Sequence, residues 1–256
     1  MFADDEARLL IEAARSSSEL DELARRRVAG EPLEHLVGWA MFCGLRVQLG
    51  PGVFVPRPRS EFLVEQAVAA LADTVARPAV VVDLCCGSGA IGLAVATRVA
   101  TINTGASIEL HASDIDPVSI GWAAENLRGI GAQTYCGNLF ESIPSRLQRN
   151  VDLVVANVPY VPTSDLGLLP SEARKHEPAA ALDGGRDGLD VLRSAADAAR
   201  SWLREGGQML VETSERQRPM AVECLRQLGF AATSVSNSES SAVVVTGRWQ
   251  AKSLHT

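Results

Sequence analysis

The stretch that decides the fold is Val80-Val81-Val82-Asp83-Leu84-Cys85-Cys86-Gly87-Ser88-Gly89-Ala90-Ile91-Gly92. Its first three residues are apolar, which is typical of a strand buried on both faces of a parallel sheet. Gly87, Gly89 and Gly92 have the spacing G-x-G-x-x-G, which predicts a tight turn followed by a helix over 89–99. Glycine lets the backbone approach a ligand closely, and the start of a helix offers free N–H groups. The stretch therefore predicts a ligand-binding loop at the end of a buried strand.

Strands and helices alternate in the rest of the chain. We expect further strands at 107–113, 132–136, 151–156, 207–213, 230–235 and 242–248, and further helices at 117–129, 188–203 and 215–227. Seven strands interleaved with helices predict an α/β fold with a seven-stranded, doubly wound, Rossmann-like sheet. The connection over 157–187 is longer than an ordinary loop, and loops of this length are commonly functional.

The residues before this alternation have a different pattern. Apolar residues at helical spacing over 4–28 predict one or two helices, with a break near Ser16. Residues 39–49 favour β structure, with the turn expected at 50–52 and the returning strand at 53–55. Ser60 is the expected N-cap of a helix that runs to about residue 75. We predict three parts, which are a small helical N-terminal domain (1–38), a β-hairpin linker (39–59) and the α/β domain (60–250).

Composition limits the class of protein. The 256 residues are 46% hydrophobic and 21% charged, which is ordinary for a globular protein. The net charge of −7 disfavours a nucleic-acid partner, because such proteins neutralise phosphates with basic residues. The sequence has no apolar run of transmembrane length, and its acidic start is unlike a signal peptide, so we expect no membrane partner and a cytoplasmic location. The 5 cysteines and 4 histidines lack the spacing of metal ligands, so we expect reduced thiols and no metal.

Two aspartates narrow the choice of ligand. Asp114 ends the strand after the glycine loop, where a carboxylate can accept hydrogen bonds from the two hydroxyls of a ribose. This position indicates an adenosine-containing cofactor, either NAD(P) or S-adenosylmethionine. Asp83 favours S-adenosylmethionine, because a carboxylate at the start of the loop repels a pyrophosphate and suits the amino group of a methionine moiety.

Asn157-Val158-Pro159-Tyr160 follow the strand over 151–156, at the sheet edge where open α/β folds bind ligands. An NH2 group on an sp2 carbon is a poor nucleophile, because its lone pair is delocalised. The side-chain oxygen of Asn157 and the carbonyl of Val158 can accept its hydrogens and turn the lone pair toward a methyl group. Pro159 keeps Val158 extended, and Tyr160 supplies an aromatic wall. The tetrapeptide predicts methyl transfer to a planar amide or base.

With these motifs in this order, the chain resembles the release factor glutamine N5-methyltransferases, the HemK family. The resemblance covers about residues 30–235, and it includes further segments at 30–38, 54–65, 137–140 and 176–188. It implies S-adenosylmethionine as the cofactor and S-adenosylhomocysteine as the product. It also implies that the acceptor is the glutamine of the Gly-Gly-Gln loop of a peptide-chain release factor, and that the α/β domain is the methyltransferase domain.

The resemblance also implies roles for single residues. The methionine end of the cofactor is assigned to the loop residues Cys85, Cys86, Gly87, Ser88 and Gly89. Asp114 is assigned to the ribose, and Asn138 and Leu139 to the two sides of the adenine. Asn157 is expected to touch both the cofactor and the substrate.

The chain departs from the family pattern at several positions. Val158 replaces a proline, Cys85 replaces the first glycine of the cofactor loop, and Arg59 stands where an acid is usual. The helical part before Gly30 is shorter than in the family, where the N-terminal domain helps to dock the protein substrate. Two alternative functions therefore remain open at this point, which are adenine N6-methylation of nucleic acid and S-adenosylmethionine binding without catalysis.

Overall fold

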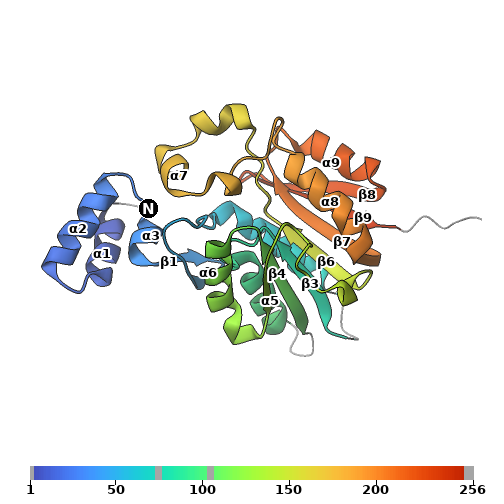
Figure 1. The fold of residues 1–256 in the computed structure, drawn as a ribbon, viewed down its shortest axis with the longest axis horizontal. Coiled ribbons are helices and arrows are strands. Elements are labelled where there is room, and N and C mark those ends of the chain that lie inside the picture. Colours follow the sequence, from blue (N-terminus) through green and yellow to red (C-terminus); the bar gives the residue numbers. More distant parts are fainter. Residues whose placement is uncertain (1–2, 73–76, 103–106, 251–256) are drawn as a thin grey trace, which may run out of the picture.

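The computed structural model describes residues 3–72, 77–102 and 107–250 (Figure 1). The helices are α1 (Ala3–Ala13), α2 (Ser17–Val28), α3 (Leu33–Val37), α4 (Glu61–Ala70), α5 (Ala90–Ile102), α6 (Pro117–Leu127), α7 (Ser171–His176), α8 (Asp190–Trp202) and α9 (Arg218–Gln227). The strands are β1 (Trp39–Phe42), β2 (Leu45–Gln48), β3 (Ala79–Leu84), β4 (Ile108–Asp114), β5 (Gln133–Cys136), β6 (Val151–Ala156), β7 (Leu203–Thr213), β8 (Phe230–Asn237) and β9 (Ala242–Trp249). No helix within these residues is long and apolar enough to cross a bilayer.

A seven-stranded sheet in the order β5-β4-β3-β6-β7-β9-β8 forms the centre of the molecule. The pairs from β5 to β7 are parallel, and β9 lies antiparallel between β7 and β8. The prediction of a doubly wound α/β sheet is confirmed. The chain leaves β3 toward β4 on one side and returns to β6 on the other, so the strand order reverses at β3. Open α/β sheets bind ligands at the carboxyl ends of the strands at such a reversal.

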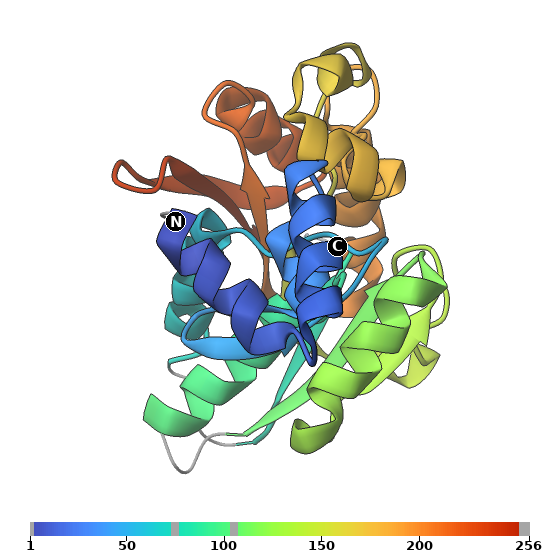
Figure 2. The ribbon, with the colours of Figure 1, turned by 90° about the vertical axis from the view of Figure 1, so that its left-hand side faces the viewer.

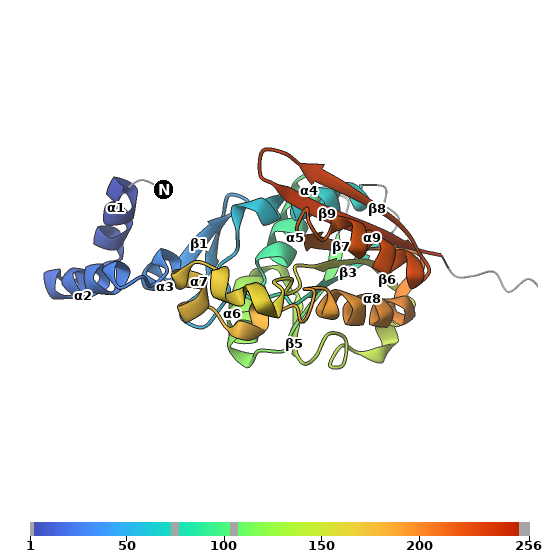
Figure 3. The same cartoon turned by 90° about the horizontal axis from the view of Figure 1, so that it is seen from above.

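The pattern of burial explains why these strands form the interior. Every residue of β3 and β6 is buried, as expected for strands with helices on both faces. Val80, Val82 and Leu84 pack into a core with α8 and α9, whereas Val81 faces a second core formed with α4, α5 and α6. Figure 3 shows α8 and α5 on opposite sides of β3. The sheet is therefore fixed on both faces, and its carboxyl edge is a rigid platform.

The first helices form a small unit with a separate apolar cluster, in which the buried residues are Leu10, Leu23, Leu33 and Leu36. Ser16 caps α2, because its side chain accepts a hydrogen bond from the N–H of Glu19 at 3.1 Å. The predicted break near Ser16 is thus confirmed, and 4–28 hold two helices. Figures 1 and 3 show α1 and α2 beyond β1, away from the sheet, and Figure 2 shows them from their own side. The division into domains at 38 and 59 stays a prediction.

The predicted position of the hairpin turn was wrong. The strands β1 and β2 pair antiparallel and are joined at Cys43 and Gly44, in the middle of the expected strand. Both joining residues have positive φ angles, 52° and 75°, which is the geometry of a tight type I′ hairpin turn. Cysteine is an unusual residue for that geometry, so the sequence does not indicate the turn. Residues 53–55 form no strand, and the chain continues from them toward the carboxyl edge of the sheet.

Ser60 stands at the predicted N-cap position of α4, but it does not cap the helix with its side chain. Ser60 itself has helical angles (φ −70°, ψ −9°), and its side chain makes no capping hydrogen bond. The helix α4 begins at Glu61 and ends at Ala70 rather than near 75, where 73–76 lie outside the described residues. The Ser60 hydroxyl instead accepts a hydrogen bond from Asn157.

The start of β7 also differs from the prediction. The strand begins at Leu203, four residues before the expected 207, and α8 ends at Trp202. The register with β6 shifts between Val151 and Leu153, opposite the Gly206-Gly207 pair, so the two glycines form an irregularity inside the strand.

Candidate active site

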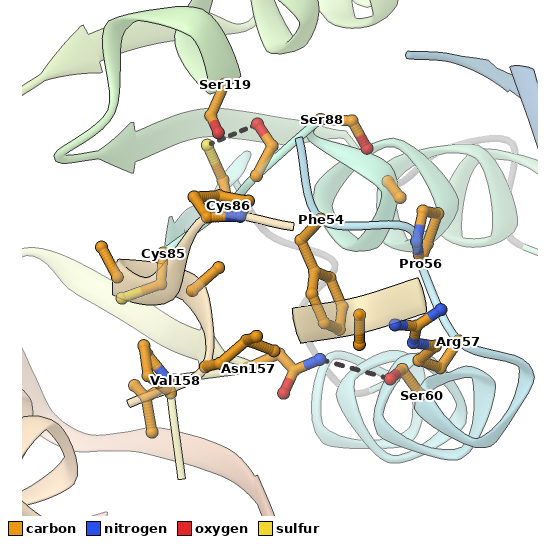
Figure 4. Close-up of a pocket in the computed structure, with 18 of the residues that line it drawn as sticks. Phe54, Pro56, Arg57, Ser60, Cys85, Cys86, Ser88, Ser119, Asn157 and Val158 are labelled. Atoms are coloured by element: carbon orange, nitrogen blue, oxygen red, sulfur yellow. Dashed lines mark hydrogen bonds between the residues drawn. The ribbon is translucent and has the colours of Figure 1, made fainter. Parts of the chain in front are cut away.

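A cavity of about 640 Å³ lies at the carboxyl ends of β3, β4 and β6 (Figure 4). Four parts of the chain line it, which are the loop after β3, the end of β4, the tetrapeptide after β6 and the segment before α4. The long connection over 157–187 closes the remaining side, with Leu169, Pro170, Glu172 and Ala173 near α7 and with Pro178, Ala180, Ala181 and Leu182. The connection that the sequence marks as unusually long is therefore a wall of the cavity.

The loop after β3 is held by Asp114. One carboxylate oxygen of Asp114 accepts a hydrogen bond from the N–H of Gly87 at 2.8 Å, and the other accepts from Asp116 at 3.0 Å. Burial raises the pKa of Asp114 above its ordinary value. Cys85 and Gly87 both have φ near 54°, so the cysteine that replaces a glycine keeps a conformation that glycine adopts without strain. The loop geometry thus survives the substitution.

Asp83 lies beneath this loop and is fully buried. Its Oδ2 accepts a hydrogen bond from the N–H of Gly92 at 2.9 Å, and its Oδ1 has no partner within the described residues. Burial raises the pKa of Asp83 to about 7, against the opposing effect of the Gly92 N–H. Asp83 is absent from the described lining of the cavity, and it supports the loop from behind.

The structure brings most of the expected site residues to one cavity. The lining includes the loop residues Cys85, Cys86, Gly87 and Ser88, the carboxylate Asp114, and Asn157, Val158, Pro159 and Tyr160. Gly89, Asn138 and Leu139 lie outside the described lining. A Cβ at Gly89 would come within 3.1 Å of Leu127, so this glycine allows close packing of the loop against α6. The Leu139 carbonyl accepts a hydrogen bond from Ser113 at 2.6 Å, next to Asp114. The cofactor contacts assigned to these residues stay predictions.

The side chain of Asn157 is oriented by one hydrogen bond. Its Nδ2 donates to the hydroxyl of Ser60 at 3.3 Å (Figure 4). Within the described part of the chain, the Asn157 Oδ1 and the Val158 carbonyl receive no hydrogen bond, so both oxygens are available as acceptors. The side chain of Val158 is 1% exposed and packs into the α8 and α9 core, which explains how an apolar residue replaces the proline of the family.

A glycine-rich loop supports the backbone of the tetrapeptide from behind. A Cβ at Gly184 would lie 2.7 Å from the carbonyl oxygen of Pro159, and a Cβ at Gly188 would lie 2.2 Å from that of Tyr160. The buried side chain of Gln217 donates to the same Tyr160 carbonyl at 2.8 Å. These contacts give a physical role to the segment 176–188, which the sequence identifies only by resemblance.

Tyr160 ends in a polar cluster that the sequence does not indicate. Arg59 donates a hydrogen bond to the Tyr160 hydroxyl, and the hydroxyl lies 3.5 Å from Glu212 Oε1. Arg59 Nε also donates to Glu212 Oε1 at 3.1 Å, and the Glu212 side chain is 2% exposed. Burial raises the pKa of Tyr160 to about 12, and the nearby carboxylate acts in the same direction. The hydroxyl is therefore protonated at neutral pH and is not a catalytic base.

Arg57 connects two segments of the cavity wall near Phe54. Arg57 Nη2 donates to Glu177 Oε1 at 2.6 Å, and the N–H of Val55 donates to the same oxygen at 3.2 Å. The guanidinium also lies over the Phe54 ring, 4.9 Å from its centre. Glu177 is buried, and burial raises its pKa while Arg57 opposes that rise. These contacts tie the segment before α4 to the end of α7, on two sides of one cavity.

A doubly wound sheet, a glycine loop, an acid at the end of β4 and Asn-x-Pro-Tyr at the end of β6 together define an α/β methyltransferase. A family model described as the Methyltransferase small domain matches residues 45–168. The chain is 41% identical over 197 residues to a release factor glutamine methyltransferase of Streptomyces coelicolor, which covers 77% of this chain and 67% of that one. The chain belongs to the release factor glutamine methyltransferase family, and its cofactor is S-adenosylmethionine.

Two other similar proteins are informative. The 4-amino-L-phenylalanine/4-methylamino-L-phenylalanine methyltransferase of Streptomyces pristinaespiralis is 37% identical over 210 residues, which cover 80% of this chain and 68% of that one. A solved methyltransferase from Pyrococcus furiosus superposes with a TM-score of 0.56 at 14% identity, covering 90% of this chain and all of that one. The structural match concerns the fold alone.

The residues at the cavity fit S-adenosylmethionine. The cofactor has a cationic amino group, a ribose and a cationic sulfonium. The unpartnered Oδ1 of Asp83 is a buried acceptor behind the loop, and Asp114 is a carboxylate in the cavity wall. Gly87 has open space where a Cβ would lie, which leaves room for a ligand against the loop. Within the described residues, neither Asp114 in the wall nor Asp83 behind the loop has a basic partner. Such acidic groups suit a cationic ligand better than a pyrophosphate.

Proposed function

We propose that this chain methylates the side-chain amide nitrogen of a protein glutamine, in a peptide-chain release factor, within the cytoplasm. One observation carries the proposal, which is a pair of acceptors at the cavity wall that have no partner among the described residues, Asn157 Oδ1 and the Val158 carbonyl. A primary amide has two N–H groups, and two acceptors match them. The identity to a release factor glutamine methyltransferase supports this acceptor, and the described cysteines, all of which are free, suit a reducing compartment.

The chain's own residues act by positioning the acceptor. When bound, S-adenosylmethionine supplies a methyl group on a sulfonium, which is electrophilic without further activation. Asn157 Oδ1 and the Val158 carbonyl accept the two amide hydrogens, so the lone pair of the nitrogen is turned toward the cofactor side of the cavity. Tyr160 covers one face of the planar group. The proton leaves after the nitrogen has become cationic, so a strong base is not required.

A free aromatic amine is a second candidate acceptor. The Streptomyces pristinaespiralis relative is named for a 4-amino-L-phenylalanine substrate, in which the NH2 group is also attached to an sp2 carbon. The cavity includes the rings of Phe42 and Phe54 beside Arg57, a combination that suits a flat apolar body with a negatively charged end. The protein acceptor is favoured, because the more similar relative is named for it.

The test uses the purified protein with methyl-labelled S-adenosylmethionine. Three acceptors are offered in parallel, which are unmethylated release factor, 4-amino-L-phenylalanine and DNA or RNA with unmethylated adenine. We expect label in the release factor, located to a glutamine by mass spectrometry. Asn157→Ala should lower the rate by about a hundredfold or more, because one of the two acceptors is lost. Label in the aromatic amine alone would move the assignment to the second candidate, and label in nucleic acid would overturn both.

A further inference from the structure

We propose that Arg59 and Ser60 form a two-point brace that sets the geometry of the methyl-acceptor site. Ser60 holds the amide of Asn157, and Arg59 holds the hydroxyl of Tyr160. The two residues are consecutive in the chain, and their partners are the first and last residues of the tetrapeptide after β6. The inference rests on the proposed function. Both are positioning residues, which act on the substrate through Asn157 and Tyr160.

The Ser60 contact holds one end of the Asn157 amide, and the other end meets the substrate. The oxygen and nitrogen of a primary amide lie on opposite sides of its carbon, so a hydrogen bond from Nδ2 to Ser60 leaves Oδ1 free (Figure 4). The reversed amide would present an NH2 group to the NH2 group of the acceptor, and two donors cannot pair. Ser60 is 1% exposed, so solvent does not compete for this hydrogen bond.

The Arg59 contact fixes the aromatic wall. The guanidinium lies 5.5 Å from the centre of the Tyr160 ring, donates to its hydroxyl, and donates through Nε to Glu212. Within the described residues, Arg59 is the only basic side chain that forms an ion pair with Glu212. The acid that the family pattern has at position 59 would face this buried carboxylate with like charge. Arg59 therefore allows contacts with Tyr160 and Glu212 that an acidic residue at this position could not make.

The brace is attached to a rigid support. Arg59 and Ser60 directly precede α4, and Leu63, Val64 and Ala67 on that helix are fully buried. Glu212 lies near the end of β7, inside the central sheet. The tetrapeptide is thus held in front by α4 and behind by the Gly184–Gly188 loop and Gln217. Rigid support on both sides is what a site needs when it works by orienting its substrate.

A double-mutant cycle tests the link from Arg59 to Tyr160. We expect Arg59→Met and Tyr160→Phe each to lower kcat about tenfold, with little change in KM for the acceptor or in cofactor affinity. In the Tyr160→Phe background, Arg59→Met should have little further effect, because its partner hydroxyl is already absent. The variants also carry Glu212→Gln in a parallel series, so that an unpaired buried charge is not the cause of a loss. Arg200→Met is the matched control, because Arg200 lies over Trp249 outside the cavity lining.

Ser60 is tested by a conservative rescue. Ser60→Ala should lower kcat, and Ser60→Thr should restore most of it, because threonine keeps the hydroxyl. A loss that threonine does not restore would contradict the orienting role. An increase in KM at unchanged kcat for Arg59→Met would also overturn the brace, because it would indicate that Arg59 contacts the substrate directly. Additive effects of Arg59→Met and Tyr160→Phe would do the same.

A spectroscopic measurement separates the brace from the choice of substrate. The chain has 2 tyrosines, Tyr135 and Tyr160, so ring-labelled tyrosine gives two NMR signals that Tyr160→Phe assigns. We expect Arg59→Met to shift the Tyr160 signal and to leave the Tyr135 signal in place, without any substrate present. An unmoved Tyr160 signal refutes the brace. Failure of the wild-type protein to label a release factor, with the Tyr160 shift present, refutes the proposed acceptor instead.

Discussion

Asp83 shows at the scale of one residue how burial and function are coupled. The side chain is fully buried, one oxygen is unpartnered, and Asp114 lies close enough to raise its pKa further. An isolated carboxylate in such a place is neutralised by a proton or by a cationic partner. Without cofactor the proton is expected, and this expectation has a consequence for stability.

We predict that Asp83 makes the protein less stable as the pH rises. Its pKa in the folded state is about 7, whereas an unfolded aspartate has a pKa of about 4. Between these values the folded chain keeps a proton that the unfolded chain has lost, so the free energy of unfolding falls as pH rises through this window and levels off above it. Asp83→Asn should remove this slope. Urea unfolding across the window, without cofactor, checks it, and an unchanged slope in the variant would contradict the prediction.

The candidate site residues that the sequence indicates are those that directly follow a strand. Asn157 to Tyr160 and the loop after β3 are contiguous, and the end of a buried strand places them at the edge of the sheet. The pair of Arg59 with Glu212 is not visible in the sequence, because 153 residues separate the partners. No local pattern marks such a pair, and only the packing of α4 against the sheet brings it together.

At the scale of the element, the loop over 184–188 limits where the tetrapeptide can lie. We predict that Gly188→Ala lowers kcat by about a hundredfold, since a displacement of the acceptor site by about an ångström has an effect of that size. The reason is that the new Cβ would lie 2.2 Å from the Tyr160 carbonyl oxygen. Initial rates at saturating cofactor and acceptor give the measurement.

Gly131→Ala is the matched control for that variant. Gly131 also has a positive φ, of 69°, but has open space where a Cβ would lie. It should lose about 1 kcal/mol of stability through backbone strain while keeping its kcat. Equal losses of kcat in the two variants would show that strain, rather than displacement of the tetrapeptide, is the cause.

The elements also show why some sequence predictions were wrong. The fully apolar strands and the amphipathic helices were predicted correctly, because the order of apolar and polar residues along the chain reflects which side chains are buried. The turn at Cys43 and Gly44 depends on positive φ angles, which cysteine seldom adopts. The segment Gly50-Pro51-Gly52 has the residue types of a turn, but no strand follows it. Ser60 stands at the N-cap position, yet its hydroxyl accepts a hydrogen bond from Asn157, which follows β6. Local propensity is overridden where a tertiary contact is available.

At the scale of the whole molecule, Arg27 connects the N-terminal helices to the cover of the cavity. Its guanidinium pairs with Glu6 of α1 at 2.8 Å, donates to the Glu31 carbonyl at 3.0 Å, and lies 3.5 Å from Glu172 of α7. Glu172 itself lines the cavity. The arrangement links α1, α2 and α7 through one side chain, although α1 and α2 lie away from the sheet (Figures 1 and 3).

We predict that Arg27→Ala weakens binding of the protein acceptor and not of the cofactor. A partly exposed ion pair contributes about 1 kcal/mol or less, so KM for the release factor should rise by no more than about fivefold. The affinity for S-adenosylmethionine should not change, because Arg27 is outside the described lining of the cavity. Arg25→Ala is the control, since among the described residues Arg25 forms an ion pair only within α2, with Glu22. Steady-state kinetics and cofactor titration by calorimetry check both variants. The prediction would be contradicted if KM for a small aromatic amine rose as much as KM for the release factor. That result would show that the helices act on the cavity itself rather than on the docking of a protein.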